Sequence, residues 1–120
     1  MAYSEILVWV VILTHILFAG MQGFLWPVVA KRLLKIEDQD AIEKTATVGR
    51  SFASYNFSIA IGLGLSFHLS ESVVLDVQIT VMALIVFTAI VGFLGTRSKV
   101  ILAARFLPAV AAFGLLFIGL

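Results

Sequence analysis

The chain has 120 residues, of which 62% are hydrophobic and only 12% are charged, with a net charge of +1. A soluble domain of this length needs more charge to cover its surface, and the mean hydropathy is +1.13. The composition therefore excludes an ordinary soluble domain, and the absence of cysteine excludes disulfides and thiolate chemistry. Because a bilayer span takes about 20 apolar residues, we expect one all-α domain over residues 1–120, a polytopic bundle of four transmembrane helices.

The first span is predicted over residues 6–27, where Pro27 closes or kinks the helix. Residues 28–37 follow as a short amphipathic stretch in which Lys31, Arg32 and Lys35 alternate with aliphatic side chains. Long cationic side chains can reach the lipid headgroups while their neighbours stay in the boundary layer. This segment is therefore predicted to be an interfacial extension of the first helix.

The second helix is predicted from about Ala41 to Leu69, with its membrane span over 50–69. Its start is indicated by Asp40 and Glu43, whose spacing is typical of a capping box. Short turns around Ser70–Ser72 and Gly95–Ser98 separate the remaining apolar runs. The third and fourth spans are therefore predicted over 73–95 and 99–120.

Orientation is predicted from the eight cationic residues, which all lie in or near the first and third loops: Lys31, Arg32, Lys35, Lys44, Arg50, Arg97, Lys99 and Arg105. Four spans place these two loops on one side, and cytoplasmic loops hold the excess of Lys and Arg. Both termini are therefore expected on the extracytoplasmic side. The predicted location is the bacterial inner (plasma) membrane, as a multi-pass protein.

Several polar side chains fall within the predicted spans, where they are costly and need an explanation. Counting helical rise places polar residues of three helices at one depth, in the cytoplasmic third of the bilayer. This polar layer consists of Gln22, Tyr55, Asn56 and Arg105. His15 lies deeper, near the midplane, and shares a helix face with Gln22 and Trp26. The candidate ligand-binding residues are His15, Gln22, Trp26, Arg50, Tyr55, Asn56 and Arg105.

Each of these residues also has a structural interpretation. Arg105 either extends to the cytoplasmic phosphates or lines an internal cavity, where no Asp or Glu stands at its depth to pair with it. Gln22 and Asn56 either join helices by hydrogen bonds or contact a ligand, and His15 has the same two alternatives. Trp26 is predicted to be an interfacial anchor, whereas Tyr55 is open between packing and cavity lining.

Small residues recur every four positions on two helices, as Ser54, Ser58, Gly62 and Ser66 and as Thr88, Gly92 and Thr96. Such stripes let helices approach closely, so both are interpreted as packing features. No sequence motif of a hydrolase, metalloprotease, phosphate loop or dinucleotide site is present. We expect no catalytic residue, metal, cofactor or nucleic-acid partner.

The order of the landmarks resembles the small bacterial membrane family catalogued as domain of unknown function 1304. The matching features are His15, Phe24-Leu25-Trp26, Tyr55-Asn56, Ala89-Ile90-Val91-Gly92, the Thr96–Lys99 turn and Leu107-Pro108-Ala109. The chain departs from the family pattern at Thr14 and Gln22, which stand where the family tends to have acids. The resemblance covers nearly the whole chain and implies four spans but no established activity.

Three functions are compatible with these observations. The first is binding or transport of a small anionic or amphipathic molecule through a cytoplasm-facing polar layer, in a homo-oligomer. The second is a structural or accessory subunit of a larger membrane complex, in which the polar layer joins helices. The third is a membrane enzyme that uses His15 as a general base on a lipid-like substrate. The expected partners are the bilayer and further membrane subunits or copies of the chain.

Overall fold

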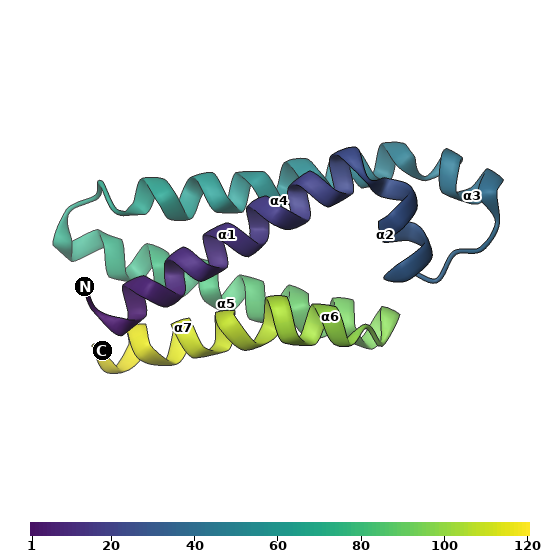
Figure 1. Ribbon diagram of the computed structural model, residues 1–120. Coiled ribbons are helices and arrows are strands. Elements are labelled where there is room, and N and C mark those ends of the chain that lie inside the picture. The colour runs from purple at the N-terminus through teal and green to yellow at the C-terminus, as the bar shows by residue number, and fades with distance from the viewer.

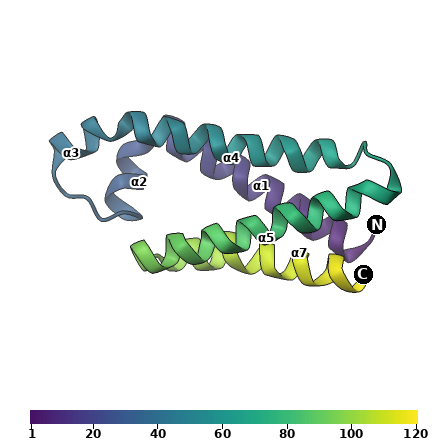
Figure 2. The same cartoon turned by 180° about the vertical axis from the view of Figure 1, so that it is seen from behind.

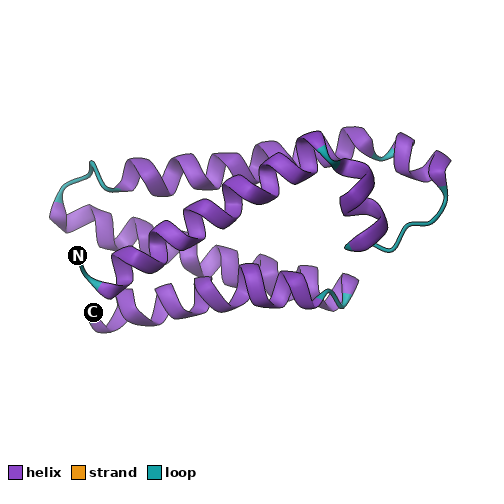
Figure 3. Ribbon diagram, in the orientation of Figure 1, coloured by secondary structure: helices purple, strands orange, loops and turns teal.

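A computed structural model describes all 120 residues as helices joined by short loops, with no strand (Figure 3). The long helices are α1 (Tyr3–Phe24), α4 (Ala46–Ser66) and α5 (Glu71–Thr96), and a fourth helical run comprises α6 (Lys99–Ile101), η1 (Leu102–Phe106) and α7 (Leu107–Ile118). They run along the long axis of a body measuring 49 × 24 × 19 Å. Both termini lie at one end with the α4–α5 turn, and α2, α3 and α6 lie at the other (Figure 1).

Three helical segments are long and apolar enough to cross a membrane: Tyr3–Phe24, Glu71–Thr96 and Lys99–Ile118. The helix α4 has 21 residues and is therefore about 30 Å long, but it is not one of the three. Its serines, its asparagine and Arg50 make it less apolar than the others. The all-helical membrane character is thus supported, while the four-span count and the side on which the termini lie stay predictions.

The first helix does not continue over 28–37 as predicted, while the interfacial position of this segment stays a prediction. The chain turns at Leu25, whose φ of −124° and ψ of 37° are not helical, and a separate helix α2 (Trp26–Arg32) begins there. Figure 2 shows α2 folding back from the end of α1. Proline has no N–H and clashes with the preceding turn inside a helix but is tolerated in the first turn, which is where Pro27 now stands.

The second predicted helix, over 41–69, is divided in two. Helix α3 (Gln39–Lys44) ends before Thr45, and α4 follows as a separate helix that ends at Ser66. The Thr45 hydroxyl donates to the carbonyl of Ala41 at 2.7 Å, a local side-chain bond that often bends helices. The boundary at Thr45 therefore lies where a hydroxyl competes with the backbone ladder.

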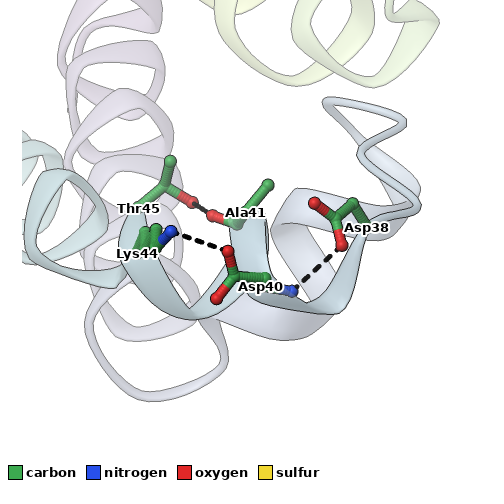
Figure 4. A network of polar contacts seen from close by, with 5 residues as sticks. All are labelled: Asp38, Asp40, Ala41, Lys44 and Thr45. Carbon is green, nitrogen blue, oxygen red and sulfur yellow. Dashed lines mark hydrogen bonds and ion pairs between the residues drawn. The ribbon is translucent and has the colours of Figure 1, made fainter.

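The cap of α3 also differs from the prediction that Asp40 and Glu43 form it. Asp38 is the N-cap residue, and its carboxylate accepts from the Asp40 N–H at 3.2 Å (Figure 4). Asp40 instead pairs with Lys44, one turn further on, at 2.7 Å. Both groups are solvent-exposed, so this ion pair contributes little to stability.

The main hydrophobic core joins α1, α4, α5 and α7 at the end of the bundle that holds the termini, with Val8, Val11, Leu63, Met82 and Ile85 at its centre. A second, smaller core forms at the opposite end from Trp26, Val29, Ala30 and Ile42. Helix α1 lies against α4 and α7, whereas α4 and α5 meet near their connecting turn and then diverge (Figure 2). The two cores leave the region between them loosely filled.

The charged loops gather at one end of the bundle. The first loop, between α2 and α3, and the third loop, between α5 and α6, both lie at the end opposite to the termini (Figure 1). The cations of these loops include Lys35 and Arg97, and both are exposed. The structure therefore concentrates the cationic side chains at one end of the bundle.

Candidate functional site

A cavity of about 810 Å³ lies between the α1–α4 pair and the α5–η1 helices. Most of its lining residues are apolar, and none is an acid. Its polar or cationic lining includes Gln22, Asn56, Thr88 and Arg105. Its size is within the range of small-molecule sites, which are mostly apolar with a few placed polar groups. The cavity is therefore the candidate site.

Two amides from neighbouring helices meet on the wall of the cavity. Asn56 is buried on α4, and its Nδ2 donates to Oε1 of Gln22 on α1 at 2.5 Å. Both residues were predicted to share a depth, and the structure places them in direct contact. The bond joins two helices, which was the structural alternative for these residues, and both side chains also line the cavity, where a ligand could contact them. The two interpretations are therefore compatible.

Arg105 lies on the opposite wall, in the π-helical turn η1. In this turn the Leu107 N–H bonds to the carbonyl of Leu102, five residues earlier. Pro108 follows at the start of α7, where its ring and missing N–H prevent the ordinary ladder. Such π-turns are rare and often lie at functional sites. The wide turn therefore lies directly before Pro108, where the ordinary helical ladder is interrupted.

The guanidinium of Arg105 has few protein partners. Its Nη2 donates to the hydroxyl of Thr88 on α5 over a long 3.5 Å. Its Nε is buried and has no hydrogen-bond partner. Because an arginine has five N–H donors in a fixed fork, most of its capacity to bind an anion is unused. A cation inside a membrane-spanning segment normally pairs with something.

His15 is fully buried on α1 but does not line the cavity. Its Nδ1 lies 2.8 Å from the carbonyl of Val11 on the same helix, so Nδ1 must be the donor and Nε2 the acceptor. Nε2 has no partner in the structure. The bond that His15 makes is therefore local, and the structure shows neither an interhelical hydrogen bond of His15 nor its exposure to the cavity.

Trp26 is not at an exposed interfacial position, contrary to the anchor prediction. It is 4% exposed, lines the cavity and donates from Nε1 to the hydroxyl of Thr45 at 3.1 Å. A Cβ atom on Gly49 would collide with its ring, so α4 passes close to the indole. The chain reversal at Leu25 accounts for this, because it turns Trp26 inward, away from the lipid.

Tyr55 and Arg50 take different places on α4. Tyr55 is 66% exposed and lines the edge of the cavity, which supports cavity lining over core packing. Arg50 is exposed, does not line the cavity and donates to the Thr47 hydroxyl at 3.1 Å. Arg50 therefore does not join the group of candidate residues that the structure assembles.

The stripe on α5 was interpreted as packing, but its three members Thr88, Gly92 and Thr96 line the cavity. Their spacing of four residues puts them on one helix face, and this was the signal available in the sequence. What the sequence could not supply was which helix that face meets. On α4, Ser58 and Gly62 of the other stripe also face the cavity.

Comparisons with known proteins identify the family and no more. No curated protein matches the chain, and no solved structure matches it. The family described as "Protein of unknown function (DUF1304)" matches residues 9–117, nearly the whole length. This match confirms the resemblance drawn from the landmarks around His15, Tyr55-Asn56 and Pro108. The chain belongs to the DUF1304 family.

Proposed function

We propose that this chain is a membrane protein that binds a small anionic or amphipathic molecule in the cavity between α1–α4 and α5–η1. The single observation that supports this most is the state of Arg105. It is a cation whose Nε lacks any partner, in a mostly apolar cavity without an acid. An anion would provide the partner that the protein does not.

The polar groups around Arg105 suit an oxyanion. The Thr88 hydroxyl lies next to the guanidinium, and the amide pair of Gln22 and Asn56 lies on the opposite wall. Guanidinium groups bind carboxylate and phosphate through parallel N–H bonds, which are stronger than neutral hydrogen bonds. The large apolar remainder of the cavity favours a ligand with a hydrocarbon portion over an inorganic ion.

The proposal includes α4 as a fourth span. Its 21 residues match the length needed to cross the hydrocarbon core, and it packs along α1, which is apolar enough to span. The cation-rich end then faces the cytoplasm by the positive-inside rule, and both termini face outward. On this arrangement the cavity is in the cytoplasmic half of a bacterial inner membrane. Labelling single-cysteine variants from each side of the membrane tests this topology.

An accessory role in a larger assembly is the second candidate, and one observation favours it. Ser51, Ser54 and Ser58 form an exposed small-residue face on α4, and each hydroxyl bonds to a carbonyl of its own helix. A helix of a second copy or another subunit could approach such a surface closely. Stoichiometric co-purification of another subunit from native membranes would support this role.

The test of binding is the loss of ligand-dependent stabilisation in Arg105→Leu. The protein is placed in nanodiscs of zwitterionic lipid and titrated with dodecyl phosphate, with dodecanol as the uncharged probe. We expect dodecyl phosphate to raise the thermal midpoint of the natural protein, since a ligand that binds only the folded state stabilises it. Dodecanol should have a much smaller effect.

The matched controls are Arg105→Lys and Arg50→Leu. The first keeps a positive charge at the site and should retain part of the stabilisation, because lysine lacks the fork of donors. The second removes an exposed cation that does not line the cavity and should retain nearly all of it. Equal stabilisation of natural protein and Arg105→Leu would refute the proposed site.

A further inference from the structure

The cavity is open along the seam between α4 and α5. The two helices diverge from their connecting turn (Figure 2), and both contribute cavity-lining residues that are also exposed. Tyr55 on α4 is 66% exposed, and Leu84 on α5 is 60% exposed. Since these side chains lie in the middle parts of long membrane helices, the solvent that they face is hydrocarbon. The opening therefore leads sideways into the bilayer.

The two ends of the cavity are lined by different parts of the chain. At the end near the charged loops, α2 and the residues after it contribute Val29, Leu33 and Leu34 to the lining. Towards the other end lies the main core, where Leu63 and Met82 are fully buried. The most exposed large apolar side chains of the lining, Tyr55 and Leu84, lie at the seam between these two ends, which favours entry along the seam.

Polarity and volume restrict the occupant further. From Arg105 and Thr88 the cavity extends towards apolar side chains nearer the middle of α5, including Val81. At roughly 30 Å³ per methylene, similar to the volume share of a water molecule, the 810 Å³ holds one chain of about sixteen carbons with a headgroup but not two such chains. The end of the cavity with Arg105 and Thr88 lies closer to the charged loops than the end with Val81 does. In the same way, the headgroup of a lipid in that leaflet lies closer to the membrane surface than its tail.

We infer that the occupant is a single-chain lipid anion that enters sideways from the bilayer between α4 and α5, with its headgroup at Arg105 and its tail along the seam. This inference rests on the proposed function and specifies its ligand class and route. The shared chemistry is an oxyanion, which a lipid headgroup or a free phosphate ester could supply. The experiment has to separate these two sources.

The fluorescence of Trp26 can report ligand binding, because this side chain lines the cavity and is only 4% exposed. The chain has two tryptophans, and Trp9→Phe leaves Trp26 alone while keeping an aromatic ring against Phe67, on which Trp9 stacks. The full chain in zwitterionic nanodiscs is titrated with lysophosphatidate brominated near its headgroup. The comparison ligands are brominated lysophosphatidylcholine, and glycerol 3-phosphate added as a competitor. We expect brominated lysophosphatidate to quench the fluorescence of Trp26 in a saturable way. The zwitterionic lipid should bind with about tenfold weaker apparent affinity. Glycerol 3-phosphate should compete little with lysophosphatidate.

The route is tested by narrowing the seam with Gly62→Phe. Gly62 lines the cavity, and a Cβ added there meets nothing within 4 Å, so the substitution does not force a clash at the Cβ position. Gly64→Phe is the matched control, because it has the same open surroundings on the same helix but does not line the cavity. We expect Gly62→Phe to weaken quenching by about tenfold and Gly64→Phe to leave it unchanged, with thermal midpoints confirming that both variants fold.

The outcomes separate the two proposals. The lipid route would be overturned if glycerol 3-phosphate displaced the brominated lysophosphatidate efficiently and Gly62→Phe had no effect on quenching. Anion binding at Arg105 would then remain intact. Binding of both lysolipids with equal affinity would overturn the anionic headgroup. Failure of every anion to bind, with Arg105→Leu indistinguishable from the natural chain, would overturn the proposed function itself and this inference with it.

Discussion

The helix α4 meets its two neighbours in opposite ways. Against α1 it packs closely along its length, and at the junction of α1 and α2 Gly49 lies so near Trp26, the first residue of α2, that even a methyl group would collide with the indole. Against α5 it packs only near the turn, and Gly62 faces open space. Both interfaces contain glycine, yet in one it permits contact and in the other it borders a cavity. A small residue in a membrane helix therefore predicts a close approach only where a partner is present.

The largest expected effect lies on the tight side, in Gly49→Ala. The added Cβ must displace the Trp26 ring or the backbone near the Gln22 carbonyl, 3.0 Å away. We expect the free energy of unfolding to fall by about 2 kcal/mol, the usual cost of overpacking. Thermal unfolding in detergent micelles measures this change.

The matched control for that variant is Gly64→Ala, where the new methyl group meets nothing within 4 Å. It should leave the midpoint unchanged or raise it, because alanine has the higher helix propensity by about 1 kcal/mol. Identical midpoints for Gly49→Ala and the natural protein would show that α4 is not closely packed against Trp26 of α2.

A moderate effect is expected at the amide pair that joins α1 to α4. Removing either partner, in Gln22→Leu or Asn56→Leu, breaks the 2.5 Å hydrogen bond between them. Interhelical hydrogen bonds in membranes contribute about 0.6 kcal/mol on average and at most about 1.7. We expect a coupling energy in that range from a double-mutant cycle with both single variants and the double variant. Strict additivity of the two losses would mean that the bond does not form in the bilayer.

The smallest effect is expected on the loose side, at Gly62 and Gly92. A Cβ on Gly62 meets nothing, and one on Gly92 meets Ile101 at an ordinary 3.8 Å. Gly62→Ala and Gly92→Ala should therefore leave the free energy of unfolding unchanged or raise it by up to about 1 kcal/mol. A clear loss of stability in Gly62→Ala would show that α4 and α5 close on each other, and the lateral opening would then be wrong.

Helix spacing predicted the depth of the candidate residues but not which of them lie together. Gln22, Asn56 and Arg105 were predicted to share a depth, and depth follows from the count of residues along each helix. A common cavity was one of the alternatives for these residues, and in the structure all three line one cavity. His15 was placed on the same face as Gln22 by spacing alone, yet it is buried away from the cavity and bonds to its own helix. Helix spacing defines a face but not the neighbour that the face meets.

The composition and the hydrophobic runs by themselves determined that this chain is helical and suited to a membrane, because hydrophobic runs of this length leave few other solutions in lipid. The residue landmarks also determined the DUF1304 family, which the family match confirms. Only the tertiary structure decided that Trp26 turns inward at Leu25, that Thr88 faces Arg105, and that α4 leaves α5 beyond their turn. These features depend on loop geometry and on how helix faces pair over long sequence separations, which local periodicity does not encode.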